Sequence, residues 1–226
     1  MPYCVRCGIK LPEDEEVRFC PNCGAPVSFK PQQYIKKRRE TRRSLQTASR
    51  KTRFLTFLFA LFLCVAVTSA GALSKIDDSE VQGIVEDFEK VENMLQTAGV
   101  QLIFGNNMMY CLVMFIPFVG PIGGFYVLYS TGKILSALSS MLGADPIFLF
   151  LSLMIYPHAW LEYASYSLAV SESMWLSFYL LRYGFKGLKA EASNAAKYIS
   201  ICGVLLLAGA FVEMELIRLV SITIPT

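Results

Sequence analysis

The stretch FLTFLFALFLCVAVTSAGAL, residues 54–73, contains no charged side chain over 20 positions. A helix of about 20 apolar residues is long enough to cross the hydrocarbon core of a bilayer. Further apolar tracts follow at residues 108–130, 134–181 and 198–220. A soluble protein can bury one helix of this length and composition in its core, but hardly four of them. The sequence therefore predicts an all-α polytopic membrane protein.

The distribution of charge predicts how the chain is oriented in a cell membrane. Only 17% of the 226 residues are charged, whereas about a quarter are charged in a soluble domain. Residues 1–53 carry 13 Lys or Arg against 5 Asp or Glu, and residues 74–100 carry 2 against 7. Because basic residues near a span stay in the cytoplasm, we expect the N-terminus inside and residues 74–106 outside. Topology and attraction to anionic lipid account for the basic run at 36–53, so a nucleic-acid ligand is not expected.

Charges and helix breaks together predict about five transmembrane helices, with the C-terminus outside. The basic loop from Arg182 to Lys197 is expected inside, so the chain crosses an even number of times between Lys133 and this loop. Breaks at GADP (143–146) and YPH (156–158) allow a hairpin that turns at the second break. They also allow a half-helix that re-enters from the inside. The expected spans are about residues 54–73, 107–130, 134–156, 158–181 and 198–220.

Between the first two expected spans, residues 79–98 are predicted to form an external amphipathic helix. Apolar residues recur there at three- and four-residue steps, at Val81, Ile84, Val85, Phe88, Val91 and Leu95. The acidic residues on the other face are most simply explained as a solvated surface.

The N-terminal cysteines predict a small metal-binding module. Cys4, Cys7, Cys20 and Cys23 form two C-x2-C pairs, CVRC and CPNC, with a twelve-residue spacer. Two such pairs suit tetrahedral zinc, and four thiolates leave no open position for a catalytic metal. Disulfides are disfavoured on the reducing side of the membrane. We therefore expect a zinc ribbon at 1–26 holding one structural Zn²⁺, and a basic linker or juxtamembrane helix at 27–53. The other cysteines, Cys64, Cys111 and Cys202, are expected to be small core residues.

Several polar residues stand within or beside the apolar tracts. Charged groups at bilayer depth are costly unless they face other helices or water, so each is a functional candidate. His158 and Glu162 are four residues apart on one helix face. With a rise of about 1.5 Å per residue, the expected topology brings them to the same depth as Asn106, Asn107 and Glu213. We expect these five to meet in a polar cluster in the outer half of the bilayer, as structural contacts or as a ligand or partner site.

Short motifs along the apolar part resemble a known family. The motifs are IFGNN (103–107), glycines at 120 and 124, STG (130–132), PHAWLE (157–162) and AGAFVEMELIRLVSITIP (208–225). They are similar to the membrane domain of stage II sporulation protein M, over about residues 50–226. The matched positions are Asn106, Asn107, Gly120, Gly124, Gly132, His158, Glu162 and Glu213. Gly120 and Gly124 have the GxxxG spacing that allows close helix packing. Thr131 and Ala159 depart from the family pattern.

The resemblance implies an integral membrane partner protein. In spore-forming bacteria the family member belongs to a membrane complex that remodels peptidoglycan, and it acts beside the hydrolases. The zinc ribbon is an addition to the core family, and such additions are more typical of archaeal proteins. We therefore expect a non-enzymatic scaffold that recruits protein partners through the zinc ribbon and its external face, with a homo-oligomer left open.

Two other functions remain open from the sequence. A permease or a lipid- or solute-handling protein could use broken helices and the buried His158, Glu162 and Glu213 as a pathway. An intramembrane hydrolase is the third alternative, although no G-x-S-x-G motif is present.

Overall fold

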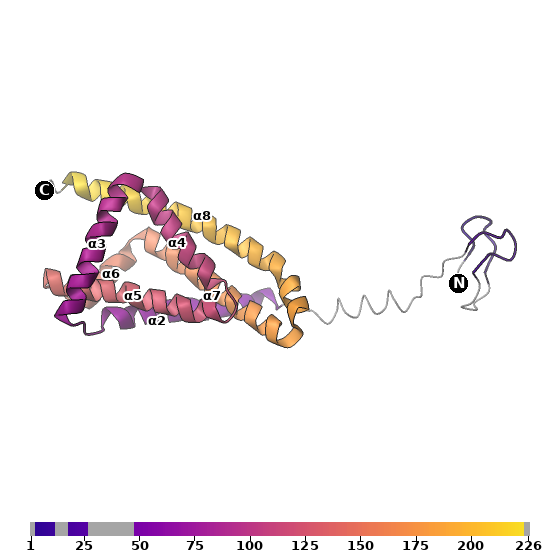
Figure 1. Cartoon of the computed structure of the whole chain (residues 1–226), viewed down its shortest axis with the longest axis horizontal. Helices are drawn as coiled ribbons and strands as arrows, with labels where there is room; N and C mark the ends of the chain where they lie inside the picture. Colours follow the sequence, from indigo (N-terminus) through magenta and orange to yellow (C-terminus); the bar gives the residue numbers. More distant parts are fainter. Residues whose placement is uncertain (1–2, 12–17, 27–47, 224–226) are drawn as a thin grey trace. The chain divides into compact units, whose positions relative to one another are not determined.

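The computed structural model describes residues 3–11, 18–26 and 48–223. The chain divides into two compact units, Met1–Gln46 and Thr47–Thr226. In the described part of the second unit, all regular structure is helical (Figure 1). The helices are α2 (Arg50–Ala72), α3 (Asp78–Ala98), α4 (Val100–Met114), α5 (Val119–Leu142), α6 (Pro146–Ile155), α7 (Pro157–Tyr183) and α8 (Phe185–Thr223).

Helix α2 begins within the last residues of the basic run, at Arg50. Ser49 is its N-cap, and the Ser49 hydroxyl accepts a hydrogen bond of 3.2 Å from the backbone N–H of Thr52. This bond satisfies one of the amides that a helix start leaves unpaired. The rest of the expected linker, residues 27–47, lies outside the described residues. Large apolar side chains such as Phe54, Leu55 and Phe62 are exposed on α2, which suits a helix that faces lipid.

The core of the second unit lies between the long helices. Helices α7 and α8 form the most extensive pair, followed by α2 and α5. As expected from the sequence, Cys64, Cys111 and Cys202 are fully buried and contribute to this core. Small side chains at these points allow the helices to approach closely.

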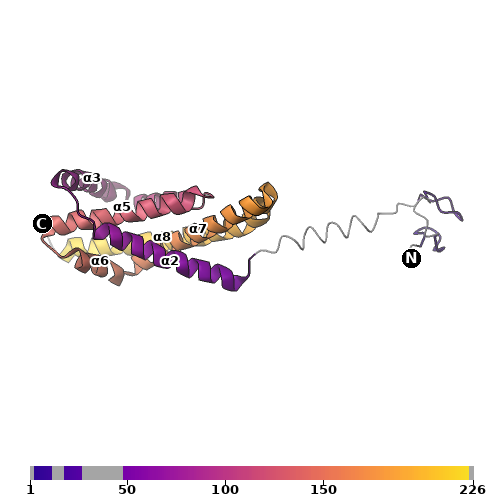
Figure 2. The ribbon, with the colours of Figure 1, turned by 90° about the horizontal axis from the view of Figure 1, so that it is seen from below.

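Glycines fix the closest contact between α2 and α5. A Cβ atom added at Gly132 would overlap the backbone carbonyl oxygen of Thr68 and would lie 2.8 Å from the Cα of Gly71. The two helices therefore touch backbone to backbone, and they converge toward the C-terminal end of α2 (Figure 2). Gly120 and Gly124 lie at another contact, where an added Cβ at Gly124 would meet Val170 of α7 at 3.1 Å.

The chain breaks between α4 and α5, inside the region expected to form one span at 107–130. Pro117 lies in this break, and Phe118 has φ 65°, a conformation that non-glycine residues rarely adopt. Two serines of α7 hold the turn in place. The Ser177 hydroxyl accepts a 2.8 Å bond from the Phe118 N–H, and the Ser173 hydroxyl donates a 2.6 Å bond to the Ile116 carbonyl.

A second break shows that the expected span at 134–156 is not one continuous helix. Gly143 ends α5 in a left-handed conformation, and Asp145 caps α6 by accepting bonds of 2.7 and 3.1 Å from two backbone amides. Helices α5 and α6 are bent by 119°. With 10 residues, α6 is about 15 Å long, half the thickness of a bilayer core. Asp145 is therefore a helix cap and needs no functional explanation.

The expected boundary between two spans near Lys133 is also absent. Helix α5 continues through this residue. Its ammonium group pairs with Glu80 of α3, and the neighbouring Ser136 hydroxyl donates a 2.8 Å bond to the Ser74 carbonyl. Lys133 therefore lies at the α3 end of the bundle, whereas the sequence interpretation had placed it at the opposite end.

By length and hydropathy, α2 and α8 could each cross a membrane, and the bent pair of α5 and α6 could form a third span or a re-entrant loop. Helix α7 has 27 residues, yet it is not apolar enough to be counted with them. The expected amphipathic helix at 79–98 is present as α3, Asp78–Ala98. The described residues thus give two or three candidate spans, and the count of five remains a prediction.

The glycine contact can be tested with two variants of α5. We expect Gly132→Ala to destabilise the bundle by roughly 1–3 kcal/mol, because the new methyl group overlaps the α2 backbone. The control is Gly123→Ala, since a Cβ there meets only Val113, at 3.9 Å. That change should be neutral or stabilising by up to about 1 kcal/mol, through helix propensity. Reversible unfolding in mixed detergent measures both, and equal stability of the two variants would contradict the contact.

Candidate functional site

The cysteine module is built from two similar turns. Cys4 N–H bonds the Ile9 carbonyl at 2.9 Å and Gly8 N–H bonds the Cys4 carbonyl at 2.8 Å. The second turn repeats the pattern, with Cys20 N–H to Ala25 O at 2.8 Å and Gly24 N–H to Cys20 O at 2.9 Å. Gly8 and Gly24 have φ 71° and 65°, which glycine adopts without strain. The two turns correspond to the C-x2-C-G pattern that occurs twice in the sequence, at 4–8 and 20–24.

The two turns bring the four cysteine sulfurs together. Cys4 Sγ and Cys23 Sγ are 3.6 Å apart, as are Cys7 Sγ and Cys20 Sγ. All four sulfurs lie within 4.8 Å of one another. Sulfurs at the corners of a tetrahedral zinc site are about 3.8 Å apart. The residues therefore fit one tetrahedral metal ion, with no coordination position left for a substrate.

The ionisation of these cysteines favours a bound cation. The backbone N–H of Ile9 helps lower the pKa of Cys7 to about 6. Cys23 accepts a bond from the Ala25 N–H, which lowers its pKa, but burial and the neighbouring cysteine side chains raise it to about 12. Four adjacent sulfurs thus resist ionising together. A divalent metal supplies the positive charge that allows all four to become thiolates.

In the helical unit, the structure brings together part of the expected polar cluster. The Asn107 side-chain amide of α4 donates a 2.7 Å hydrogen bond to the Glu162 carboxylate of α7. Glu213 of α8 lies close enough for its charge to act on Glu162. Three helices thus contribute one polar group each, and all three side chains are partly buried.

The other two expected members lie outside these contacts. Asn106 is exposed, because adjacent residues on a helix point about 100° apart. His158 is buried, and its ring stacks on Tyr156 with centroids 5.7 Å apart. Its Nδ1 atom is buried without a hydrogen-bond partner. A histidine at the first turn of α7 therefore reaches the core, but makes no hydrogen bond to Glu162.

A second polar cluster was not identified from the sequence. The Arg53 guanidinium of α2 pairs with Glu172 of α7 at 2.8 Å and also with Glu191 of α8. The carboxylates of Glu172 and Glu191 are 2% and 1% exposed. Asn194 donates a 2.9 Å bond to Glu191, and the Arg53 guanidinium lies 5.5 Å from the centre of the Trp175 ring. This contact joins the start of α2 to the junction of α7 and α8.

The signals for this cluster were weak. Arg53 is the last of many basic residues and looked like part of a solvated run. Glu191 is the one acidic residue between Arg182 and Lys197. An isolated acid in a basic segment is the sequence feature that points to this ion pair. Only the folded chain brings residues 119 and 138 positions apart into contact.

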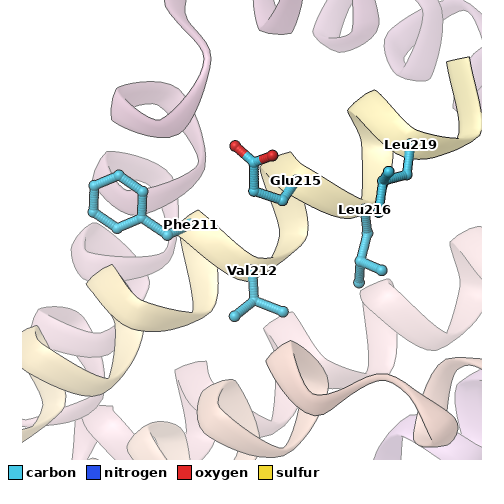
Figure 3. A pocket seen from close by; sticks show the side chains of 5 residues that line it. All are labelled: Phe211, Val212, Glu215, Leu216 and Leu219. Carbon is cyan, nitrogen blue, oxygen red and sulfur yellow. The ribbon is translucent and has the colours of Figure 1, made fainter. Parts of the chain in front are cut away.

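A shallow hollow along α8 lies apart from both clusters. It is lined by Phe211, Val212, Glu215, Leu216 and Leu219. Figure 3 shows the Glu215 carboxylate turned away from the apolar Val212 and Leu216 side chains, and Glu215 pairs with Arg218 at 2.7 Å. A hollow with one acid, already paired, does not form a chemical site.

The cysteine module makes a direct prediction about metal content. We expect one zinc per purified chain, and none in the Cys20→Ser/Cys23→Ser variant, because two ligands cannot hold the ion tightly. Cys202→Ser, a change in the helical core, should retain the metal. Elemental analysis of all three proteins decides the question. A full zinc equivalent in the double variant would assign the metal to other residues.

The comparisons with known proteins agree with the helical unit. The family model described as Stage II sporulation protein M matches residues 54–214. No curated protein and no solved structure matches the chain. The family match begins one residue after Arg53, includes both Glu172 and Glu191, and leaves out the cysteine module. Because it covers more than half of the sequence, the chain belongs to the stage II sporulation protein M family.

Proposed function

We propose that this protein is a non-enzymatic scaffold of the cell membrane, whose zinc ribbon recruits a cytoplasmic partner and whose external face meets an envelope partner. The observation that carries the proposal is the division into two compact units. One is built around four cysteines, and the other is a helical bundle. A structural metal module without an open coordination position serves folding and docking better than chemistry.

The use of polar groups in the bundle supports the same function. Arg53 pairs with two acids of other helices, and Glu162 accepts a bond from Asn107. Such contacts hold helices together where lipid offers no hydrogen bonds. These contacts stabilise the bundle, as a membrane anchor for bound partners requires.

In this proposal the chain crosses the membrane five times, with its N-terminus in the cytoplasm. The long helices α2, α5 and α8 run in one direction, and α4 and α7 run in the other (Figure 1). The Arg53–Glu191 contact brings the basic start of α2 to the same end as the basic residues after α7. Basic residues gathered at one end favour the cytoplasmic side for that end. The acidic α3 then lies outside.

A permease is the second candidate, and the buried acids favour it. Oxygen atoms of Glu172 and Glu191 are buried without hydrogen-bond partners, and Glu162 lies near Glu213. A proton or solute flux in proteoliposomes that is lost in Glu162→Gln would rank the permease above the scaffold.

Affinity purification from membranes tests the scaffold. We expect a stoichiometric partner with the native chain and loss of that partner with Cys20→Ser/Cys23→Ser, because the recruiting module needs its metal to fold. Cys202→Ser is the matched control and should keep the partner. Recovery of the native chain alone, or only as a homo-oligomer, would contradict recruitment.

Cysteine labelling tests the topology. In a background without the native cysteines of the bundle, a cysteine at Gly83 of α3 should react with a membrane-impermeant reagent from outside the cell. Gly83 has open space around it, so the change is tolerated sterically. A cysteine at Lys186, which is exposed, should react only after the cytoplasmic side is opened. The reverse pattern would invert the proposed orientation.

A further inference from the structure

The cluster of Arg53, Glu172 and Glu191 has an uneven count of charges. One guanidinium faces two carboxylates, and both carboxylates are almost completely buried. Asn194 and Trp175 complete the surroundings without adding charge. With both acids ionised the cluster carries one net negative charge, which is expensive in a medium of low dielectric constant.

Each carboxylate also keeps one oxygen atom without a partner. Glu172 Oε2 and Glu191 Oε1 accept bonds from Arg53, whereas Glu172 Oε1 and Glu191 Oε2 are buried and unpaired. The two carboxyl groups bind neighbouring nitrogens of one guanidinium, Glu172 at Nη1 and Glu191 at Nη2, which holds them side by side. Two acceptors facing each other cannot bond unless one of them carries a proton.

A single proton resolves both problems. It brings the charge of the cluster to zero, and it turns one carboxyl group into a donor for the other. The unpaired oxygens expose essentially no surface, so a hydrated metal cation would need room that they do not offer. We propose that Glu172 and Glu191 form a proton-binding site, in which one proton is shared between the two carboxyl groups and Arg53 balances the remaining charge.

The surrounding titratable groups are few. Arg53 approaches from α2, and Tyr198 of α8 acts on Arg53 electrostatically. On α7, Tyr179 lies one turn beyond Trp175, and its hydroxyl accepts a 2.7 Å bond from the Ala48 N–H. Arginine stays protonated around pH 7. The charge of the cluster near neutral pH is therefore set by the two glutamates.

The proton-binding site does not depend on partner recruitment by the cysteine module.

The proton is taken up from water as the chain folds, since a glutamate in the unfolded chain is ionised at neutral pH. Folded chains bind one more proton than unfolded chains at that pH, so stability falls as pH rises. The linked change is up to tenfold in the unfolding equilibrium constant per pH unit.

The experiment uses the full chain in detergent with its zinc bound. Glu172→Gln and Glu191→Gln each keep the shape of the side chain and leave one carboxylate to pair with Arg53, so neither needs the proton. Infrared spectroscopy should show one protonated carboxyl band in the native chain that both variants lose. Glu215→Gln, a change of an exposed acid on α8, is the control and should keep it.

The second readout is the unfolding constant measured from pH 6 to pH 9. We expect the native chain and the Glu215→Gln control to change about tenfold more per pH unit than either cluster variant, wherever the folded site remains protonated. If a cluster variant fails to fold, the native chain and Glu215→Gln still test the proposal, because both should show the protonated carboxyl band and the pH-dependent unfolding constant. If neither protein shows the band or the pH dependence, the proposal is overturned.

A metal cation in place of the proton is the remaining outcome. Replacing sodium and potassium by choline at constant ionic strength should leave the stability of the native chain unchanged. A loss of stability on replacement, absent in Glu172→Gln, would assign the site to a monovalent metal ion and would overturn the proton assignment.

Discussion

The constraint on which the bundle depends is the lack of water inside a bilayer. A polar group there must find its partner within the protein, because hydrocarbon offers none. Serine and threonine hydroxyls accordingly bond backbone carbonyls one turn earlier, as Thr68 does with Cys64 at 3.0 Å and Ser165 with Leu161 at 2.8 Å. Longer side chains reach across helices, and Asn107 and Glu162 are joined in this way. The polar contacts therefore determine which helix faces meet.

The same constraint explains which parts of the fold were predictable. Apolar periodicity and length are local properties, and they predicted a helical membrane protein and the helix now seen as α3. The turns depend on distant residues. Ser173 and Ser177 of α7 hold the break before α5, while Lys133 is paired by Glu80, 53 positions earlier. A charged residue with a distant partner looks like the end of a span when only its neighbours are considered.

The candidate sites also differ in how far their residues could be predicted from the sequence. The four cysteines have fixed spacings, so their approach could be predicted from C-x2-C geometry alone. Asn107 and Glu162 stood out because amides and acids are rare in apolar tracts. Arg53 and Glu191 stood among other charged residues, and no local pattern separated them from a solvated surface. The burial of these two residues follows from the packing of α2 against α7 and of α7 against α8.

The Ser49 cap and the Arg53 contacts have a consequence for how this bundle carries an appended module. Inserting one residue between Ser49 and Arg53 would rotate the guanidinium by about 100° around the helix axis relative to the cap, and deleting one would rotate it the other way. The Ser49 cap and the ion pairs of Arg53 with the two acids could then no longer form together. The Ala48 N–H also bonds the Tyr179 hydroxyl of α7, so the fixed register begins one residue before the cap. A soluble domain exchanged during evolution or by fusion keeps these contacts when the junction lies before Ala48.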